Sequence, residues 1–352
     1  MPPPTISVAV VQGWPRGYLG SALESVDGAV ARLGSAVERV AVLGGPDPEG
    51  ARMIAAEHPE WAVAGPVDAP MGRSVGRAIR STCGEVLCFL DDDDRFLPGK
   101  LVHVAERFAA DPTLSYLHHE VELIDPAGHP IHYPGFRSHV RGVMRPGRVI
   151  DLPAGAKRTQ LGRLAKAGAD FNTSSMVVRR SAVEPFLPWI ERAEAGIDAL
   201  LFFIAALAAP GAIRCEGDRW TQYRLHAGNV SWSGGGPGAR AALAGASLRQ
   251  AEGQRLLIEL GHSLGDPELE RIAGAIVEGH RFFATLRSPH PSRRQSLRAI
   301  TQIAPYLTAF PVRPLWPAIA GSLAMLVAPR AAQKVYLERI AEGADPPPGP
   351  PV

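Results

Sequence analysis

The sequence predicts an α/β protein with a mostly parallel sheet, helices on both faces of the sheet, and a helical C-terminal region. Short β-branched apolar runs alternate with segments of helical spacing from residue 6 to about residue 124. Repeated strand–helix–strand units of this kind fold into a doubly wound parallel sheet. After about residue 236 the apolar residues recur at helical spacing only. The chain has 352 residues, 46% of them hydrophobic, so it can bury a large core.

The expected elements of the first half alternate along the chain. Residues 6–12 form an unbroken apolar run typical of a buried strand, and Leu19, Leu23 and Val26 begin a helical stripe that ends at Leu33. Further strands are predicted at 40–43, 62–64, 86–90 and 114–124, with Gly65-Pro66 ending the second of these. Helices are predicted at 51–58, 74–83 and 99–109.

The second half is less regular. Residues 133–170 carry eight Arg and Lys side chains against Asp151 and Asp170, which predicts a solvated loop or a flexible loop that closes over an anionic ligand. A strand is expected at 175–178, a helix from Asp198, and a strand at 220–225. We therefore expect a first domain over 1–235, a helical region over 236–344, and a disordered Pro-rich tail over 345–352.

Charge and cysteine content narrow the class of protein. Lys and Arg number 37 against 35 Asp and Glu, so the net charge of +2 argues against a nucleic-acid binder held by bulk charge. Three cysteines are too few for a disulfide framework, and the N-terminus lacks the pattern of a signal peptide. These observations predict a cytoplasmic protein. An apolar stretch within 307–329 is short for a membrane span, so a buried helix or peripheral contact with the inner face of a membrane is expected there.

The strongest chemical signal is a run of four aspartates, Asp91 to Asp94, at the end of the strand predicted at 86–90. Four adjacent carboxylates repel one another unless a cation neutralises them. In a doubly wound sheet, ligands bind at the carboxyl ends of the strands. Hard carboxylate oxygens there suit Mg²⁺ or Mn²⁺, which usually bridge protein carboxylates to a phosphate.

Three other kinds of site fit the acidic run less well. An EF-hand calcium loop fails, because Phe96 stands where Gly is required and Val102 where the bidentate Glu belongs. A phosphatase with an Asp-x-Asp nucleophile motif fits Asp91 and Asp93, although Arg95 breaks its last position. A simple acidic helix cap needs one carboxylate and not four.

Residues 84–94, followed by Pro98, Lys100 and Leu101, resemble the family 2 glycosyltransferases, whose nucleotide-sugar-binding fold is called GT-A. The segments 6–26, 123–128, 172–180 and 223–231 resemble four further motifs of that family in the same order. The resemblance spans roughly residues 5–235. It implies a metal-dependent transfer of a sugar from a nucleotide-sugar donor to an acceptor hydroxyl, with inversion by direct displacement.

The resemblance also implies roles for single residues. The donor nucleotide would contact Gln12, Asp91, Asp92 and Arg224, and the Mn²⁺ or Mg²⁺ ion would be held by Asp93 and His226. The sugar or the acceptor would lie near Ser174 and Ser175. Asp198 would be the catalytic base, with Glu194 in reserve and a helix N-cap as the alternative role of Asp198.

Three positions depart from the family pattern. The second strand ends at Leu43-Gly44 with only Asp47 nearby, where the family has aspartates that read the nucleobase. Val75-Gly76 replaces an Arg-Asn pair, and Ile197 replaces a Glu before the base. The nucleobase is therefore open, and a catalytically silent binding subunit is the first alternative function.

A second motif points to a different enzyme class. Residues 261–265 match the Gly-x-Ser-x-Gly elbow of α/β-hydrolases, which requires a strand before the serine. The residues before Gly261 have helical spacing instead, so we expect Gly261 to cap a helix and Asp266-Pro267 to begin the next one.

Overall fold

The computed structural model describes residues 4–67, 71–132, 144–153, 164, 168–209, 211–226, 229, 239–288 and 292–306. The chain divides into two compact units, Met1–Ile131 with Arg141–Arg224, and His132–Val140 with Leu225–Val352. The apolar stretch 307–329 and the tail 345–352 lie outside the described residues, as does much of the basic segment 133–170.

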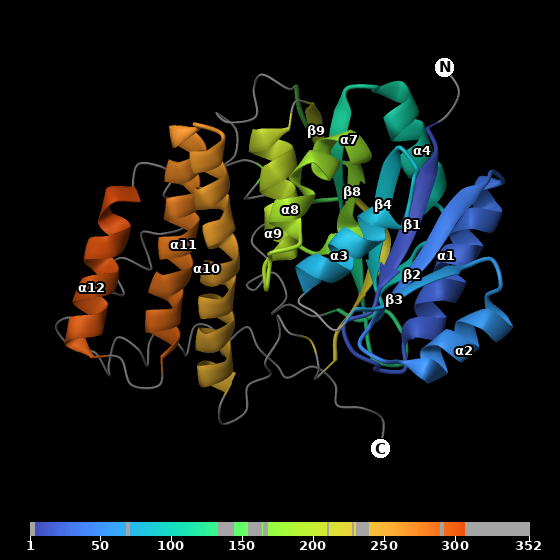
Figure 1. Cartoon of the computed structure of the whole chain (residues 1–352), viewed down its shortest axis with the longest axis horizontal. Coiled ribbons are helices and arrows are strands. Elements are labelled where there is room, and N and C mark those ends of the chain that lie inside the picture. Colours follow the sequence, from blue (N-terminus) through green and yellow to red (C-terminus); the bar gives the residue numbers. More distant parts are fainter. Residues whose placement is uncertain are drawn as a thin grey trace. The chain divides into compact units, whose positions relative to one another are not determined.

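The first unit is built on one sheet of nine strands, in the order β3-β2-β1-β4-β8-β6-β9-β5, with β7 paired to β9 (Figure 1). The strands β1 to β4 are mutually parallel, and β8 runs antiparallel between β4 and β6. The strands β6 and β9 are parallel to each other, while the short β5 and β7 pair antiparallel with β9. The predicted mostly parallel α/β sheet is confirmed. The strand bounds are β1 Ile6–Val11, β2 Val37–Gly44, β3 Ala62–Val67, β4 Val86–Asp91, β5 Arg95–Phe96, β6 Leu114–Ile124, β7 Val149–Leu152, β8 Met176–Arg179 and β9 Ala212–Arg224.

Helices cover both faces of this sheet, as predicted. The helix α1 buries Leu19, Leu23 and Val26 in the core and packs with α4 on one face, while α3 lies on the other (Figure 1). The apolar side chains of these helices exclude water from the apolar faces of the parallel strands, which stabilises the sheet. The helix bounds are α1 Leu19–Leu33, α2 Pro48–Glu57, α3 Met71–Arg80, α4 Lys100–Ala110, α7 Arg180–Val183, α8 Leu187–Ile190 and α9 Ile197–Phe203.

Three strand predictions were wrong in part. Gly65-Pro66 does not end β3, which continues to Val67. Because β3 is the last strand at its edge of the sheet, the missing N–H of Pro66 removes no necessary ladder bond. The basic segment is not all loop, because residues 149–152 form β7 with Ile150 and Leu152 buried. The strand β9 also begins eight residues earlier than predicted, at Ala212, because charged residues along it mask its strand pattern.

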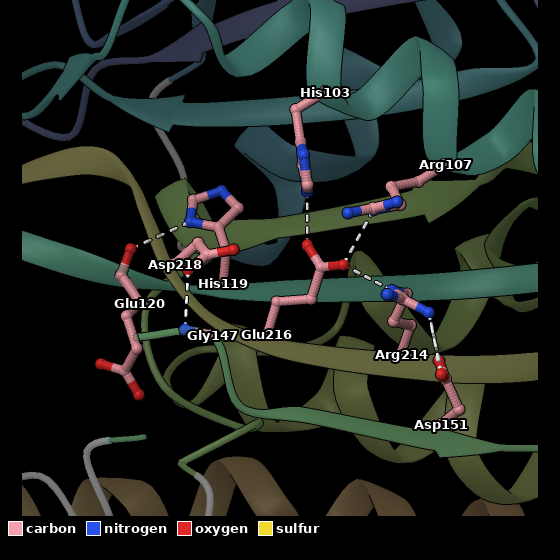
Figure 2. Close-up of polar contacts among 9 residues, drawn as sticks. All are labelled: His103, Arg107, His119, Glu120, Gly147, Asp151, Arg214, Glu216 and Asp218. Atoms are coloured by element: carbon pink, nitrogen blue, oxygen red, sulfur yellow. Dashed lines mark hydrogen bonds and ion pairs between the residues drawn. The ribbon is translucent and has the colours of Figure 1, made fainter. Parts of the chain in front are cut away.

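A buried carboxylate ties α4, β7 and β9 together (Figure 2). The side chain of Glu216, 1% exposed, contacts His103 and Arg214, and it forms an ion pair with Arg107 at 2.8 Å. Arg214 continues to Asp151 on β7, with both carboxylate oxygens at 2.8 Å. Burial alone would raise the pKa of Glu216, but the hydrogen bonds from His103 and Arg214 outweigh it and lower that pKa to about 2.

The described part of the second unit is helical, as predicted. Its helices are α10 Ala239–Ser263, α11 Pro267–Arg287 and α12 Arg293–Ile303, followed by a short 3₁₀ turn at Ala304–Tyr306. Ser263 therefore lies on a helix and not on a hydrolase elbow. The predicted cap at Gly261 was wrong, because α10 continues to Ser263 and the left-handed residue is Gly265, at φ 61°. The Asp266 side chain caps α11 as expected.

Among the residues that the structure describes, no helix is both long and apolar enough to cross a membrane.

Candidate functional site

The acidic run lies where β4 ends, beside the end of β1. The backbone N–H of Asp92 donates to the carbonyl of Val11 at 3.2 Å, which continues the pairing of the two strands into the run. Asp92, Asp93 and Asp94 are each less than 9% exposed, and Asp91 is partly exposed. The run therefore lies at the carboxyl edge of the parallel strands, the usual ligand edge of such a sheet.

The carboxylates of Asp91, Asp93 and Asp94 come together. One oxygen atom from each lies within 4.8 Å of the others. Burial, followed by the charge of Asp93, raises the pKa of Asp91 to about 7 and the pKa of Asp92 to about 8. The same two causes raise the pKa of Asp94 well above its usual range. The site thus concentrates carboxylates whose negative charge the surrounding basic groups offset only in part.

This donor set fits a hard divalent cation. All three converging groups are carboxylates, the ligands that Mg²⁺ and Mn²⁺ prefer. In addition, Oδ2 of Asp92 is buried and has no hydrogen-bond partner among the described residues. Asp94 was missed as a candidate ligand, and its place in the acidic run was the available signal.

The Ser-rich segment before β8 holds the acidic run from one side. Thr173 donates its hydroxyl to Oδ1 of Asp91 at 2.9 Å, and the backbone N–H of Asp91 donates to the Ser174 hydroxyl at 3.0 Å. Ser174 and Ser175 are fully buried, and the Ser175 hydroxyl has no partner among the described residues. Ser174 therefore positions Asp91, while Ser175 makes no comparable contact.

A buried ammonium lies behind this segment. Lys100, the first residue of α4, is 0% exposed and donates from Nζ to the carbonyl of Ser174 at 2.6 Å and to the hydroxyl of Thr221 at 3.0 Å. Its Nζ also lies 3.7 Å from the centre of the Phe96 ring. Lys100 thus fixes the backbone that carries Ser174.

Asn172 connects the acidic run to the predicted base. Its side chain donates to Oδ2 of Asp94 at 3.2 Å and accepts from the backbone N–H of Ser174. Its own backbone N–H is hydrogen-bonded to the carboxylate of Asp198. Asn172 has φ 64° and ψ 112°, a strained conformation outside glycine, and its several hydrogen bonds hold it there.

Asp198 lies in the first turn of α9 and is partly buried. Burial raises the pKa of its carboxyl to about 6, although the hydrogen bond from the backbone N–H of Ala199 to Oδ1, at 2.9 Å, opposes this rise. The alternative role as an N-cap was wrong, because the helix begins after Gly196, whose φ is 68°. The reserve candidate Glu194 is exposed.

Arg224 ends β9 and is 2% exposed. Its backbone N–H donates to Oδ1 of Asp94 at 3.0 Å, and its guanidinium donates to the carbonyls of Asp93, Asp125 and Pro126 at 2.7–3.1 Å. The guanidinium also stacks over the Tyr18 ring at 4.5 Å. Arg224 is therefore next to the acidic run, and these bonds connect the run to the turn after β6.

A second arginine, which the sequence did not single out, reaches the run from the loop after β1. Arg16 donates from Nη1 to Oδ2 of Asp93 at 2.9 Å, with side-chain exposures of 23% and 9%. Only its place in the loop after the first strand could have suggested it.

The end of β2 is crowded. Gln12, 1% exposed, donates from Nε2 to Oδ2 of Asp47 at 3.0 Å, and Asp47 also caps α2. A Cβ at Gly44 would lie 2.3 Å from the carbonyl oxygen of Gln12, so this position has no room for a side chain. The nearest carboxylate to this strand end is thus Asp47, held by Gln12.

The structure also places the two other departures from the family pattern, at Val75-Gly76 and Ile197, and the predicted metal ligand His226. Val75 is buried in α3, and a Cβ at Gly76 would meet the side chain of Glu191 at 2.4 Å. Ile197 is buried at the start of α9. His226 is 7% exposed, and its backbone N–H donates to Oδ1 of Asn229 at 2.6 Å. The role of His226 as a metal ligand stays a prediction.

Comparison with known proteins identifies the fold family of the structure. No protein-family model matches the chain, and no curated protein sequence matches it either. Among solved structures, the chain is similar to Staphylococcus aureus TarS 1–349 in complex with UDP-GlcNAc, with TM-score 0.52 and 12% identity over 95% of this chain and 92% of that one. A second crystal structure of TarS 1–349 gives TM-score 0.50 and 11% identity over the same shares. TarS is a GT-A glycosyltransferase, and the GT-A fold predicted for this chain is confirmed.

Proposed function

We propose that the protein is a glycosyltransferase that moves a sugar from a nucleotide-sugar donor to an acceptor hydroxyl, with inversion at the anomeric carbon. The observation that carries the proposal is the cluster of Asp91, Asp93 and Asp94 at the ligand edge of a GT-A sheet. TarS, whose fold is similar, was crystallised with UDP-GlcNAc. That complex supports a donor of the same chemical class here.

The donor's diphosphate would lie at the acidic run. Asp93, with Asp91 and Asp94 beside it, would hold a Mn²⁺ or Mg²⁺ ion, and His226 remains a further candidate ligand. When bound, such an ion neutralises charge on the diphosphate as it departs. Asp91 and Asp92 would lie next to the nucleotide, and Arg224 would support the diphosphate by fixing the backbone of Asp93.

The base would be Asp198. In the reaction, the acceptor oxygen forms a bond to the anomeric carbon as the bond to the diphosphate oxygen breaks, and the carboxylate takes the hydroxyl proton. A carboxyl with pKa about 6 is ionised near neutral pH, yet it is basic enough to accept that proton. Its link through Asn172 to Asp94 supports this assignment, because acceptor and donor must be aligned together.

The remaining predicted residues take supporting roles. Gln12 would contribute to nucleotide binding by holding Asp47, the carboxylate next to the end of β2, in place. Ser174 would position Asp91 from beneath the sugar, and Ser175 would fill the space beside it. We further propose a cytoplasmic location, with contact to the inner face of a membrane through residues 307–329.

A thermal-shift screen of nucleoside diphosphates and nucleotide sugars, each with and without Mn²⁺, tests the proposal. We expect one nucleotide to stabilise the protein only with metal, and Asp93→Ala to abolish the shift. Donor hydrolysis by the same sample would exclude a silent binding subunit. Turnover of a phosphomonoester without any sugar nucleotide would instead favour the phosphatase.

The role of Asp198 needs its own test. Asp198→Asn should abolish transfer to the acceptor while the donor affinity stays within about twofold of the wild type. Equal loss of donor binding would contradict the assignment of Asp198 as the base.

A further inference from the structure

Arg16 and a divalent cation would need the same atom of this site. The Nη1 atom of Arg16 lies 2.9 Å from Oδ2 of Asp93, which is hydrogen-bond and ion-pair distance. Asp93 is also a member of the carboxylate cluster that suits a metal. A guanidinium at this distance would repel a doubly charged ion bound to the same carboxylate.

The position of Arg16 allows its side chain to move away from Asp93. It lies in the loop between β1 and α1, where Trp14 and Pro15 are exposed and Gly17 has φ 77°. The Arg16 side chain is 23% exposed, whereas the buried cation Lys100 is 0% exposed and bonded to Ser174 and Thr221. The acidic run therefore has two buried basic side chains held in place, Lys100 and Arg224, and one arginine at its surface that can exchange.

We propose that Arg16 neutralises Asp93 while no metal is bound, that a divalent cation displaces it, and that the displaced guanidinium then binds the donor's diphosphate. The last step rests on the proposed function, whereas the displacement does not. In this scheme Arg16 is a positioning residue that weakens binding of metal alone and strengthens binding of metal together with a nucleoside diphosphate. The two effects have opposite signs, which a purely structural role would not produce.

The first measurement is a titration of the purified protein with Mn²⁺ alone, with free Mn²⁺ followed by electron paramagnetic resonance. Arg16→Gln should bind Mn²⁺ about fivefold or more tightly than the wild type, because a positive charge and a competitor are both removed. Arg95→Gln is the matched control. Arg95 follows Asp93 by two residues and makes no ion pair among the described residues. An unchanged or weaker affinity in Arg16→Gln, or an equal gain in both variants, would overturn the displacement.

A structural measurement keeps the test independent of the variants. A crystal structure of the wild-type protein with Mn²⁺ should show Asp93 on the ion and Arg16 withdrawn from it. An ion on Asp93 with the Arg16 contact retained would overturn the proposal even if every variant misfolded.

The diphosphate step is tested by titrating UDP, GDP, ADP and CDP at saturating Mn²⁺. The diphosphate that binds the wild type should bind Arg16→Gln about tenfold more weakly, and Arg95→Gln within about twofold of the wild type. An unchanged affinity in Arg16→Gln would overturn this step. If no diphosphate binds the wild type, the proposed function fails, and the Mn²⁺ titration still decides the displacement.

Discussion

The first unit holds two buried carboxylate assemblies with opposite electrostatics. At the end of β4, the carboxyls of Asp91, Asp92 and Asp94 have raised pKa values, since burial and the charge of Asp93 disfavour their ionised forms. On β9, Glu216 is equally buried, but His103, Arg107 and Arg214 surround it and its pKa falls to about 2 (Figure 2).

This difference in electrostatics distinguishes a candidate binding site, the acidic run, from a structural ion-pair network around Glu216. In the Glu216 assembly, the side chains of His103, Arg107 and Arg214 supply the positive charge, so no ligand is needed. The assembly joins α4, β7 and β9. The acidic run carries an excess of negative charge at the ligand edge of the sheet, which costs stability until a cation arrives. Burial of a carboxylate alone therefore does not point to a functional site, whereas burial without enough cations makes the acidic run a candidate one.

Asp93→Asn should have the largest effect on function. We expect the transfer rate to fall about 10³-fold, about 4 kcal/mol, because one of the three converging carboxylates is lost. The free energy of unfolding without metal should change by less than about 1 kcal/mol, since the Arg16 pair is partly exposed. Initial rates and urea denaturation measure the two quantities, and a large loss of stability would place Asp93 with Glu216 instead.

Glu216→Gln should behave in the opposite way. Removal of the charge leaves His103 and two arginines without their partner, so we expect a loss of about 3 kcal/mol in the free energy of unfolding. Mn²⁺ affinity should stay within about twofold of the wild type. Urea denaturation and metal titration of one preparation measure both, and a selective loss of metal binding would contradict the structural role.

The contribution of Glu216 should also depend on pH. The pKa of Glu216 falls from 4.5 when unfolded to about 2 when folded. The ionised native form therefore adds about 3 kcal/mol that is fully present above pH 4.5 and lost as the pH falls toward 2. The stability difference between wild type and Glu216→Gln should accordingly shrink by more than half between pH 6 and pH 3. A constant difference over that range would show that Glu216 is not held by its cations.

On the catalytic side, the transfer rate should fall about tenfold per pH unit below about 6. Asp198 has a pKa of about 6 and must be ionised to accept a proton. A profile of kcat/KM at saturating metal, from pH 4.5 to 8, measures this limb. Asp198→Glu should move its midpoint, and a limb that stays in place would assign it to another group.

The smallest effect should distinguish two neighbouring serines of the site. Ser174→Ala removes the acceptor of the Asp91 N–H and should cost about 1–2 kcal/mol of stability. Ser175→Ala removes a buried hydroxyl that has no partner among the described residues, so its stability should stay within about 0.5 kcal/mol. Equal losses in thermal unfolding would show that burial, and not bonding, decides their contribution.

The fold was largely predictable from sequence, because the parallel strands are continuous apolar runs and the helices carry clear stripes. Residues 6–11 illustrate this. The strands β7 and β9 were missed or shortened, since Asp151, Arg214 and Glu216 pair across them and give no apolar signal. The acidic run was visible as a motif. Its partner Arg16 was not, because a loop contact 77 residues away in sequence has no local pattern.

The crowding at Gly44 has an evolutionary consequence. A side chain there would meet the carbonyl oxygens of Gln12 and Gly13 at 2.3 and 2.5 Å, so an aspartate at position 44 could be accommodated only if the backbone moved. Descendants of this protein could more readily gain or lose a carboxylate at exposed or half-buried neighbours such as Asp47. A carboxylate at position 44 would require at least one compensating change in the loop after β1.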